Sequence, residues 1–373
     1  MKPNSGTPRR NFLAAALAFP AARLDTGLPV RVLGKTGLKV TTLGFGCAWT
    51  SDASVFTRAL DLGVNHFDTA PVYQGGNNEA MVRVGIGNRR KQIVLSTKTE
   101  AASRAEALRQ LERSLKELGT DYVDIWYLHG KDSPEGIRAD LVEAQEIAKR
   151  QGKTRFIGVS THRLIQTAPA ILKTGKMEVV LAACNFTMDP AVEQAAASLH
   201  KAGLGLVNMK AMAGGPANAR WPGQDALPGA FQQPGVPGAS LKWVLARSVF
   251  TSALVGMLSR DEVEENIASP LAPFTEADRK LLAVRLPQIR PLYCRMCGRC
   301  DGRCPRGLPV AEILRYLMYA ESYGQFPSAR QHFQRLPQPV TRVRCADCAA
   351  CPVHCPNGVM VRQRLAKAQD WLA

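Results

Sequence analysis

Short apolar runs rich in β-branched residues alternate with segments of helical periodicity along most of the chain. The runs cover residues 41–48, 64–70, 92–99, 121–130, 154–161, 178–186, 204–211 and 251–257. Strands that alternate with helices form parallel sheets, and eight strand–helix units close into a barrel. The pattern therefore predicts an α/β fold, a (β/α)8 TIM barrel.

End signals mark several helices. Residues 103–119 open on Ser103, a favoured N-cap residue, carry leucines at helical spacing and stop at Gly119. A further helix should begin near Thr275 and lead out of the barrel. Residues 308–324 also have helical apolar spacing, so the C-terminal region is predicted to be mainly helical.

One connection of the barrel is unusual. Between Met212 and Ala239 the chain holds five Pro and six Gly, and this segment exceeds an ordinary strand-to-helix loop. Loops that follow barrel strands lie over the active site, so we expect this one to cover the mouth of the barrel.

Two cysteine runs near the C-terminus share one spacing. Residues 294–305 (CRMCGRCDGRCP) and 345–356 (CADCAACPVHCP) both read C-x2-C-x2-C-x3-C-P. In two-cluster ferredoxins three close thiolates hold one four-iron cluster and the fourth reaches the other. Zinc sites usually use two separated pairs, and a repeated run of this kind is a poor disulfide framework. The spacing favours two 4Fe-4S clusters in a crossed arrangement: Cys294, Cys297, Cys300 and Cys355 for one, and Cys345, Cys348, Cys351 and Cys304 for the other.

The length allows a barrel and a small appendage. The chain has 373 residues, and a barrel of about 250 residues counts as one domain. We divide it into an N-terminal extension (1–26), a barrel (27–288) and a small, mainly helical ferredoxin-like domain (289–373).

The chain is strongly basic, with a formal net charge of +17. It lacks an aromatic-interleaved basic motif or a basic recognition helix, so we expect no nucleic-acid partner. Many arginines surround the cysteine runs, a pattern that suits an acidic redox partner or an electron carrier at a membrane surface.

The N-terminus pairs Arg9 and Arg10 with a short, Ala-rich apolar run. This resembles a twin-arginine export signal, which carries folded proteins across the membrane. The run from Phe12 to Ala22 is too short to span a bilayer, and we expect no transmembrane segment. A periplasmic location follows, with a cytoplasmic one as the alternative.

Four separated motifs resemble the aldo-keto reductases. They are RVLGKTGLKVTTLGFGC, ALDLGVNHFDTAPVY, STKT and YLHG, in family order, and the resemblance covers about residues 30 to 270. With the export signal and the cysteine runs, the chain resembles the ferredoxin-fused, exported branch of that family. The resemblance implies an oxidoreductase that interconverts a small carbonyl compound, often a sugar, and an alcohol.

The resemblance also implies a catalytic tetrad of Asp68, Tyr73, Lys98 and His129 at the carboxyl ends of three strands. Free tyrosine has a pKa near 10, so Tyr73 needs help to donate a proton. The Lys98 ammonium, held by Asp68, would stabilise the phenolate, while His129 would orient the carbonyl.

The resemblance also implies part of a nicotinamide-binding site. Asn185 matches the residue that holds the carboxamide, and Glu265 and Asn266 match residues at the adenosine end. Further contacts are expected from Gly46, Met209, Lys210, Gly256 and Glu262.

The site departs from the family pattern in three ways. Met209 replaces an aromatic residue, Gly256 and Met257 replace a phosphate-gripping pair, and Glu262 replaces an arginine. A carboxylate at position 262 repels a 2'-phosphate, so we expect NAD(P) binding that favours NAD over NADP.

We interpret the chain as a reductase whose two clusters relay electrons. The sequence leaves open how clusters that move single electrons couple to a hydride. It also leaves two alternatives: an electron-transfer or binding protein whose barrel has lost turnover, and a cytoplasmic reductase with structural clusters.

Overall fold

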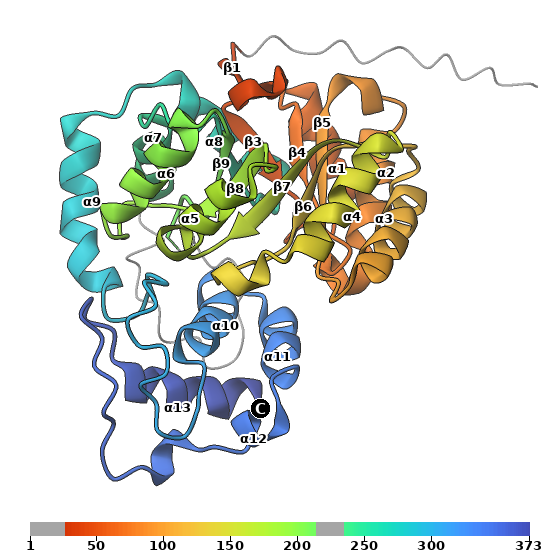
Figure 1. The fold of residues 1–373 in the computed structure, drawn as a ribbon. Helices are drawn as coiled ribbons and strands as arrows, with labels where there is room; N and C mark the ends of the chain where they lie inside the picture. The colour runs from red at the N-terminus through yellow and green to blue at the C-terminus, as the bar shows by residue number, and fades with distance from the viewer. Residues whose placement is uncertain (1–26, 214–234) are drawn as a thin grey trace, which may run out of the picture.

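The computed structural model describes residues 27–213 and 235–373. Eight parallel strands form a closed barrel in the order β10-β3-β4-β5-β6-β7-β8-β9. Figure 1 shows helices around these strands. The predicted TIM barrel is confirmed, and all eight predicted runs contain its strands. These are β3 (Leu43–Gly46), β4 (His66–Asp68), β5 (Val94–Thr99), β6 (Val123–Leu128), β7 (Thr154–Thr161), β8 (Val179–Ala183), β9 (Gly205–Met209) and β10 (Ser252–Val255).

Helices pack around the barrel and bury its outer face. The predicted helix at 103–119 is confirmed as α3 (Arg104–Leu118): the hydroxyl of Ser103 accepts a hydrogen bond from the Glu106 N–H, and Gly119 ends the helix in the left-handed conformation. The others are α1 (Ala53–Asp61), α2 (Asn78–Ile86), α4 (Ala139–Arg150), α5 (Leu164–Thr174), α6 (Ala191–Lys201), α7 (Val236–Leu245) and α8 (Arg260–Ala268), with short 3-10 turns η1 (Gly34–Thr36), η2 (Tyr73–Gly76), η3 (Arg90–Gln92), η4 (Pro134–Gly136) and η5 (Ser269–Leu271).

A hairpin closes the amino-terminal end of the barrel. Strands β1 (Val30–Val32) and β2 (Lys39–Thr41) pair antiparallel, and we did not predict them. Leu33 and Leu38 at its turn are buried and join the apolar residues inside the barrel, among them Ile125 and Val207. This β1–β2 plug fills the amino-terminal end of the barrel, so an active site can form only at the opposite, carboxyl end.

The predicted exit helix is α9 (Glu276–Ile289), which begins with a capping box between Thr275 and Asp278. The side chain of Ile289 already belongs to the apolar core of the C-terminal domain. That domain contains α10 (Val310–Tyr323), α11 (Phe326–Gln334), α12 (Gln338–Thr341), the turn η6 (Cys345–Asp347) and α13 (Val361–Leu372). Its mainly helical character is confirmed.

The C-terminal domain packs on the carboxyl end of the barrel (Figure 1). Arg315 of α10 forms an ion pair with Asp132, in the loop after β6, at 2.5 Å. Gln166 of α5 donates to the carbonyl of Cys297 at 2.7 Å. The two domains therefore meet over the strand ends that carry the candidate active site.

Parts of the sequence predictions lie outside the described residues. Arg9 and Arg10 fall there, as does most of the connection between Met212 and Ala239. The end of that segment is helical, because α7 already begins at Val236. Within the described ranges, no helix is both long enough and apolar enough to cross a membrane.

Candidate active site and cysteine centres

An ion pair buried at the end of the barrel holds the centre of the predicted tetrad. Lys98 on β5 donates to the Asp68 carboxylate of β4 at 2.5 Å and to the Thr69 carbonyl at 2.8 Å. The second Asp68 oxygen accepts from Ser96 at 2.6 Å. Lys98 is 1% exposed, so packing as well as hydrogen bonding fixes its ammonium group.

Tyr73 opens the turn η2, which follows β4, and the Lys98 Nζ lies 4.7 Å from the centre of its ring. Burial lowers the pKa of Lys98, but the charge of Asp68 outweighs this effect, so the pKa is raised and the ammonium persists. Burial raises the pKa of Tyr73, and Lys98 opposes that rise. Tyr73 therefore keeps its proton at neutral pH beside a cation that stabilises the phenolate.

His129 follows β6 and meets Tyr73 edge to face, with ring centroids 5.9 Å apart. Burial lowers the pKa of His129, so its imidazole is neutral at pH 7. Its Nδ1 lies 3.2 Å from a carboxylate oxygen of Glu100. The structure thus brings the four predicted catalytic residues together.

Sequence reasoning missed the residues that surround His129. Glu100 directly follows β5, and its position after STKT was the one available signal. Arg335 of the C-terminal domain lies 3.9 Å from Glu100. His332 on α11 stacks on Tyr316 at 5.2 Å, and no local pattern links either residue to the barrel.

The predicted carboxamide contact is occupied by protein groups. The Asn185 amide nitrogen donates to the Lys210 carbonyl at 3.0 Å and to the Tyr293 hydroxyl at 3.1 Å. Its oxygen accepts from the backbone N–H and the hydroxyl of Thr187 at 3.1 and 2.7 Å. A primary amide offers two donors and one oxygen with two lone pairs, so these contacts use its full capacity.

The neighbouring predicted contacts lie under aromatic side chains. A Cβ placed on Gly256 would meet Trp49 at 2.5 Å, so the indole touches this backbone directly. Trp49 in turn stacks on Tyr323 of α10 at 5.3 Å. The Lys210 ammonium lies 4.6 Å from the Tyr319 ring.

The other expected nicotinamide contacts lie at or near the ends of β9, β3 and β10. Met209 ends β9 half-buried, and Gly46 ends β3 beside Gly256. Met257 is fully buried in the barrel core.

The expected adenosine contacts cluster at the start of α8. The Glu262 carboxylate accepts from the Leu258 N–H at 2.7 Å, as a helix cap does. Asn266 donates to the Glu262 carbonyl at 2.7 Å, and Glu265 is exposed. Of the expected set, Asn185 is the residue least free to bind a ligand. A nicotinamide carboxamide does not fit on it while Tyr293 keeps its place.

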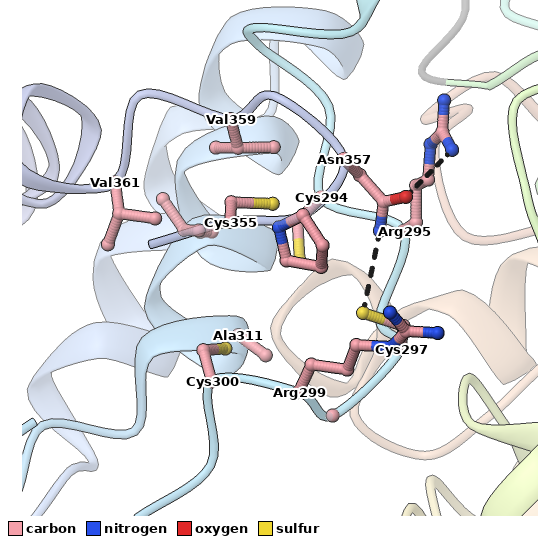
Figure 2. A pocket seen from close by; sticks show the side chains of 13 residues that line it. Cys294, Arg295, Cys297, Arg299, Cys300, Ala311, Cys355, Asn357, Val359 and Val361 are labelled. Atoms are coloured by element: carbon pink, nitrogen blue, oxygen red, sulfur yellow. Dashed lines mark hydrogen bonds between the residues drawn. The ribbon is translucent and has the colours of Figure 1, made fainter. Parts of the chain in front are cut away.

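The first predicted cysteine set surrounds one cavity, which Cys294, Cys297, Cys300 and Cys355 line together (Figure 2). Asn357 directs its amide toward the Cys297 sulfur at 3.5 Å. In residues 27–213 and 235–373, no three His, Cys, Asp or Glu side chains are arranged to hold a single metal ion. Thiols spread around a cavity suit a four-iron cube, and Cys355, the crossed cysteine, lines the same cavity as the other three.

The second predicted set also comes together. Burial and the neighbouring thiols of Cys304, Cys348 and Cys351 raise the pKa of Cys345 to about 11. Its backbone N–H donates to Gln369 of α13 at 2.9 Å. The donor chemistry again fits a four-iron cluster.

The two sets differ in their distance from the barrel. Cys297 accepts from Gln166 of the barrel, and Cys294 directly follows Tyr293, which contacts Asn185. The contacts of Cys345 and Cys348 run to α13 instead. We call the two groups the inner set (Cys294, Cys297, Cys300, Cys355) and the outer set (Cys345, Cys348, Cys351, Cys304).

Two protein families match parts of the chain. The Aldo/keto reductase family matches residues 50–222, and the 4Fe-4S dicluster domain matches residues 293–360. The chain therefore carries an aldo/keto reductase domain followed by a 4Fe-4S dicluster domain.

Individual relatives agree with this assignment. The chain is 29% identical to L-galactose dehydrogenase of Arabidopsis thaliana over 287 residues, which cover 65% of this chain and 88% of the relative. It is 33% identical over 150 residues to the uncharacterized oxidoreductase YqkF of Bacillus subtilis, or 36% of this chain and 49% of that protein. The holo form of aldo-keto reductase AKR11C1 from Bacillus halodurans superposes with a TM-score of 0.59 and 26% identity, covering 69% of this chain and 96% of that chain. These matches support an oxidoreductase whose barrel is similar to the aldo-keto reductases.

Proposed function

We propose that this protein interconverts a small carbonyl compound and an alcohol, with two 4Fe-4S clusters relaying the electrons. The observation that carries the proposal is the intact tetrad: a protonated Tyr73 beside the Lys98–Asp68 pair, at 2.5 Å, and a neutral His129. The relative named L-galactose dehydrogenase supports a sugar or sugar-like substrate.

Each tetrad residue has a role that follows from its surroundings. Tyr73 donates its hydroxyl proton to the carbonyl oxygen, and the adjacent Lys98 ammonium stabilises the phenolate left behind. Asp68 keeps Lys98 charged and in place. Neutral His129 donates a hydrogen bond that orients the carbonyl.

The reaction balances with electrons from outside the chain. A carbonyl takes two electrons and two protons, its π bond breaks, and one C–H and one O–H bond form. Tyr73 supplies the O–H proton and is reprotonated by water, which also provides the second proton. A bound pair of four-iron clusters supplies one-electron transfer between the barrel and an external one-electron carrier.

The charge around the outer set supports an acidic carrier protein as that partner. The sequence around it carries the exposed arginines Arg303, Arg306, Arg342, Arg344 and Arg362, against the exposed Asp347 and against Asp301, which is paired with Arg163. A positive surface speeds encounter with an acidic partner, and salt screens the effect. We expect added salt to slow reduction of the clusters by an acidic ferredoxin more than it slows their reduction by a neutral dye. An equal response to salt, or preferential binding to anionic vesicles, would favour the membrane-surface carrier instead.

Anaerobic turnover of the full chain tests the function. We expect about eight iron atoms per chain, and oxidation of a reduced viologen dye when small sugar aldehydes are added. The Cys355→Ser and Cys304→Ser variants should each lose about four irons, from the inner and outer sets respectively. Zinc without labile sulfide would contradict the relay. Full turnover in both variants would favour structural clusters.

A second candidate is an electron-transfer or binding protein whose barrel does not turn over. The engagement of Asn185 by Tyr293 favours it, because the barrel then lacks an open hydride-donor site. Rapid electron exchange with dyes but no carbonyl- or alcohol-dependent turnover would select this candidate.

Export by the twin-arginine route to the periplasm is the location we propose. The support is the pair Arg9 and Arg10 before an Ala-rich run. Replacing both by Lys should leave a folded, iron-bearing precursor in the cytoplasm, detected by cell fractionation. Arg23→Lys is the matched control and should leave export unchanged. Unchanged export of the double variant would favour the cytoplasmic alternative.

A further inference from the structure

Tyr293 reaches into the barrel from the segment that begins the inner cysteine set. It is 3% exposed, belongs to the apolar core of the C-terminal domain and directly precedes Cys294. Its hydroxyl accepts from the Asn185 amide at 3.1 Å across a separation of 108 residues.

The Asn185 amide has no capacity left for a second ligand. Its two N–H groups go to Lys210 and Tyr293, and its oxygen accepts twice from Thr187. Asn185 is fully buried. A carboxamide that binds here must therefore displace the Tyr293 hydroxyl, because the other partners belong to the barrel's own backbone and loop.

An aromatic cover extends from this point across the barrel mouth. Trp49 contacts Gly256 and packs on Tyr319 and Tyr323, with ring centroids 5.8 and 5.3 Å apart. Tyr319 and Tyr323 both lie on α10, whose Arg315 is anchored to Asp132. The same domain that contributes Tyr293 thus also covers the backbone expected to face the phosphates.

We propose that Tyr293 takes the place of a nicotinamide carboxamide on Asn185, so that the barrel admits no dissociable NAD(P) while the C-terminal domain is docked. This rests on the proposed function, which it deepens by naming the residue that decides the electron source. The two electrons for each carbonyl then come singly from an external one-electron donor, and the two protons come through Tyr73 and from water.

The test is nucleotide binding to the anaerobically purified full chain. NADH and NADPH are each titrated by calorimetry to about 1 mM, the upper end of usual Michaelis constants. We expect no saturable binding by the unaltered protein and no nucleotide released when it is denatured. Tyr293→Ala should bind NADH at least about tenfold more tightly than the unaltered protein. In that variant NADH should be preferred over NADPH, because Glu262 repels a 2'-phosphate.

Two further variants make the result decisive. Tyr293→Leu keeps apolar volume in the domain core but removes the hydroxyl, so it should also bind NADH more tightly than the unaltered protein. It replaces Tyr293→Ala in the test if the alanine variant loses its iron. Tyr122→Ala, at the amino-terminal end of β6, removes the same side chain far from Asn185 and should gain none. Saturable binding of either nucleotide by the unaltered protein within this range, or binding no better in either Tyr293 variant, overturns the proposal.

The same samples separate this proposal from the proposed function. If nucleotide binds to the unaltered protein and supports turnover that needs Tyr73, the carbonyl chemistry stands and nucleotide exclusion fails. If neither nucleotide binds to the unaltered protein, a Tyr293 variant gains binding, and no carbonyl is turned over with a viologen dye, nucleotide exclusion stands and the carbonyl chemistry fails.

Discussion

The two sides of the barrel mouth are built differently. The tetrad side comes from the barrel itself: Asp68 and Lys98 lie on adjacent parallel strands and form a buried ion pair. The Asn185 side is shared, because Tyr293, Trp49 and the rings of α10 fill it from two domains. The arrangement of the tetrad side therefore depends on strand geometry alone, whereas that of the Asn185 side depends on how the second domain docks.

Burial explains why the Asn185 side can exchange its hydrogen-bond partners more readily than the tetrad side can. Removing one partner of a buried ion pair leaves a charge without compensation, which is costly. The Asn185 amide needs only neutral hydrogen-bond partners, and a tyrosine hydroxyl serves as well as a carboxamide oxygen. A second domain can therefore occupy that side without disturbing the tetrad.

The largest expected effect is on the tetrad side. Tyr73→Phe should lower carbonyl turnover by about 10²- to 10⁴-fold, because it removes the proton donor and leaves the ring. Steady-state rates with a viologen dye measure this, while iron content stays unchanged. Tyr122→Phe is the control and should keep full activity. Normal turnover by Tyr73→Phe would show that the tetrad side is not the catalytic one.

The second-largest effect is expected at the ion pair between Arg315 and Asp132, which anchors the C-terminal domain on the Asn185 side. Arg315→Met leaves the Asp132 carboxylate, which is 13% exposed, without its cation, and should destabilise domain docking by about 3 kcal/mol. Faster hydrogen exchange of the α10 amides measures the loss. The control is Arg279→Met, which breaks an exposed pair with Glu276 and should change stability by less than about 0.5 kcal/mol. Equal effects of the two substitutions would contradict the anchoring role.

The same anchor should respond to pH. Burial lowers the pKa of His162 to about 3, and its Nδ1 lies 2.8 Å from Arg315. The unfolded histidine takes up a proton below about pH 6.5 while the folded one stays neutral, so stability falls as the pH drops from 6.5 toward 3. The pKa of Asp132 is also lowered, because the charge of Arg315 and the hydrogen bonds from His162 outweigh its burial, and this adds a loss of stability below about pH 4.

His162→Gln should remove the upper part of that dependence. The loss of stability between pH 7 and pH 5 should shrink by on the order of 1 to 2 kcal/mol, measured by denaturant unfolding at each pH. His200→Gln, at an exposed position of α6, is the control and should leave the profile unchanged. Identical dependence of stability on pH in the two variants would contradict the assignment of this pH dependence to His162.

The smallest effect concerns Glu262. Glu262→Ala removes an acceptor from the Leu258 N–H and should cost about 1 kcal/mol, seen as faster hydrogen exchange at the start of α8. Glu262→Gln keeps an oxygen at this place and should recover most of the loss. No change in either variant would mean that the Glu262 side chain does not cap the start of α8.

The sequence by itself determined the barrel, the tetrad and both cysteine sets. Parallel strands end at one edge, so Asp68 and Lys98 had to converge once β4 and β5 were recognised. Local signals were also sufficient for α3, because Ser103 and Gly119 act within one turn of its ends. The crossed cysteines came together because their spacing already reflects the shape of two cubes.

Only the tertiary structure decided what covers the barrel. The Asn185–Tyr293 contact joins residues 108 apart, and the Asp132–Arg315 pair joins residues 183 apart. Neither contact follows from propensity or periodicity, because each depends on how one rigid domain is oriented against another. The β1–β2 plug was missed for a related reason, since two three-residue strands carry too little periodicity to be recognised. Local patterns set which side chains exist at each strand end, and domain docking set which of them a ligand can reach.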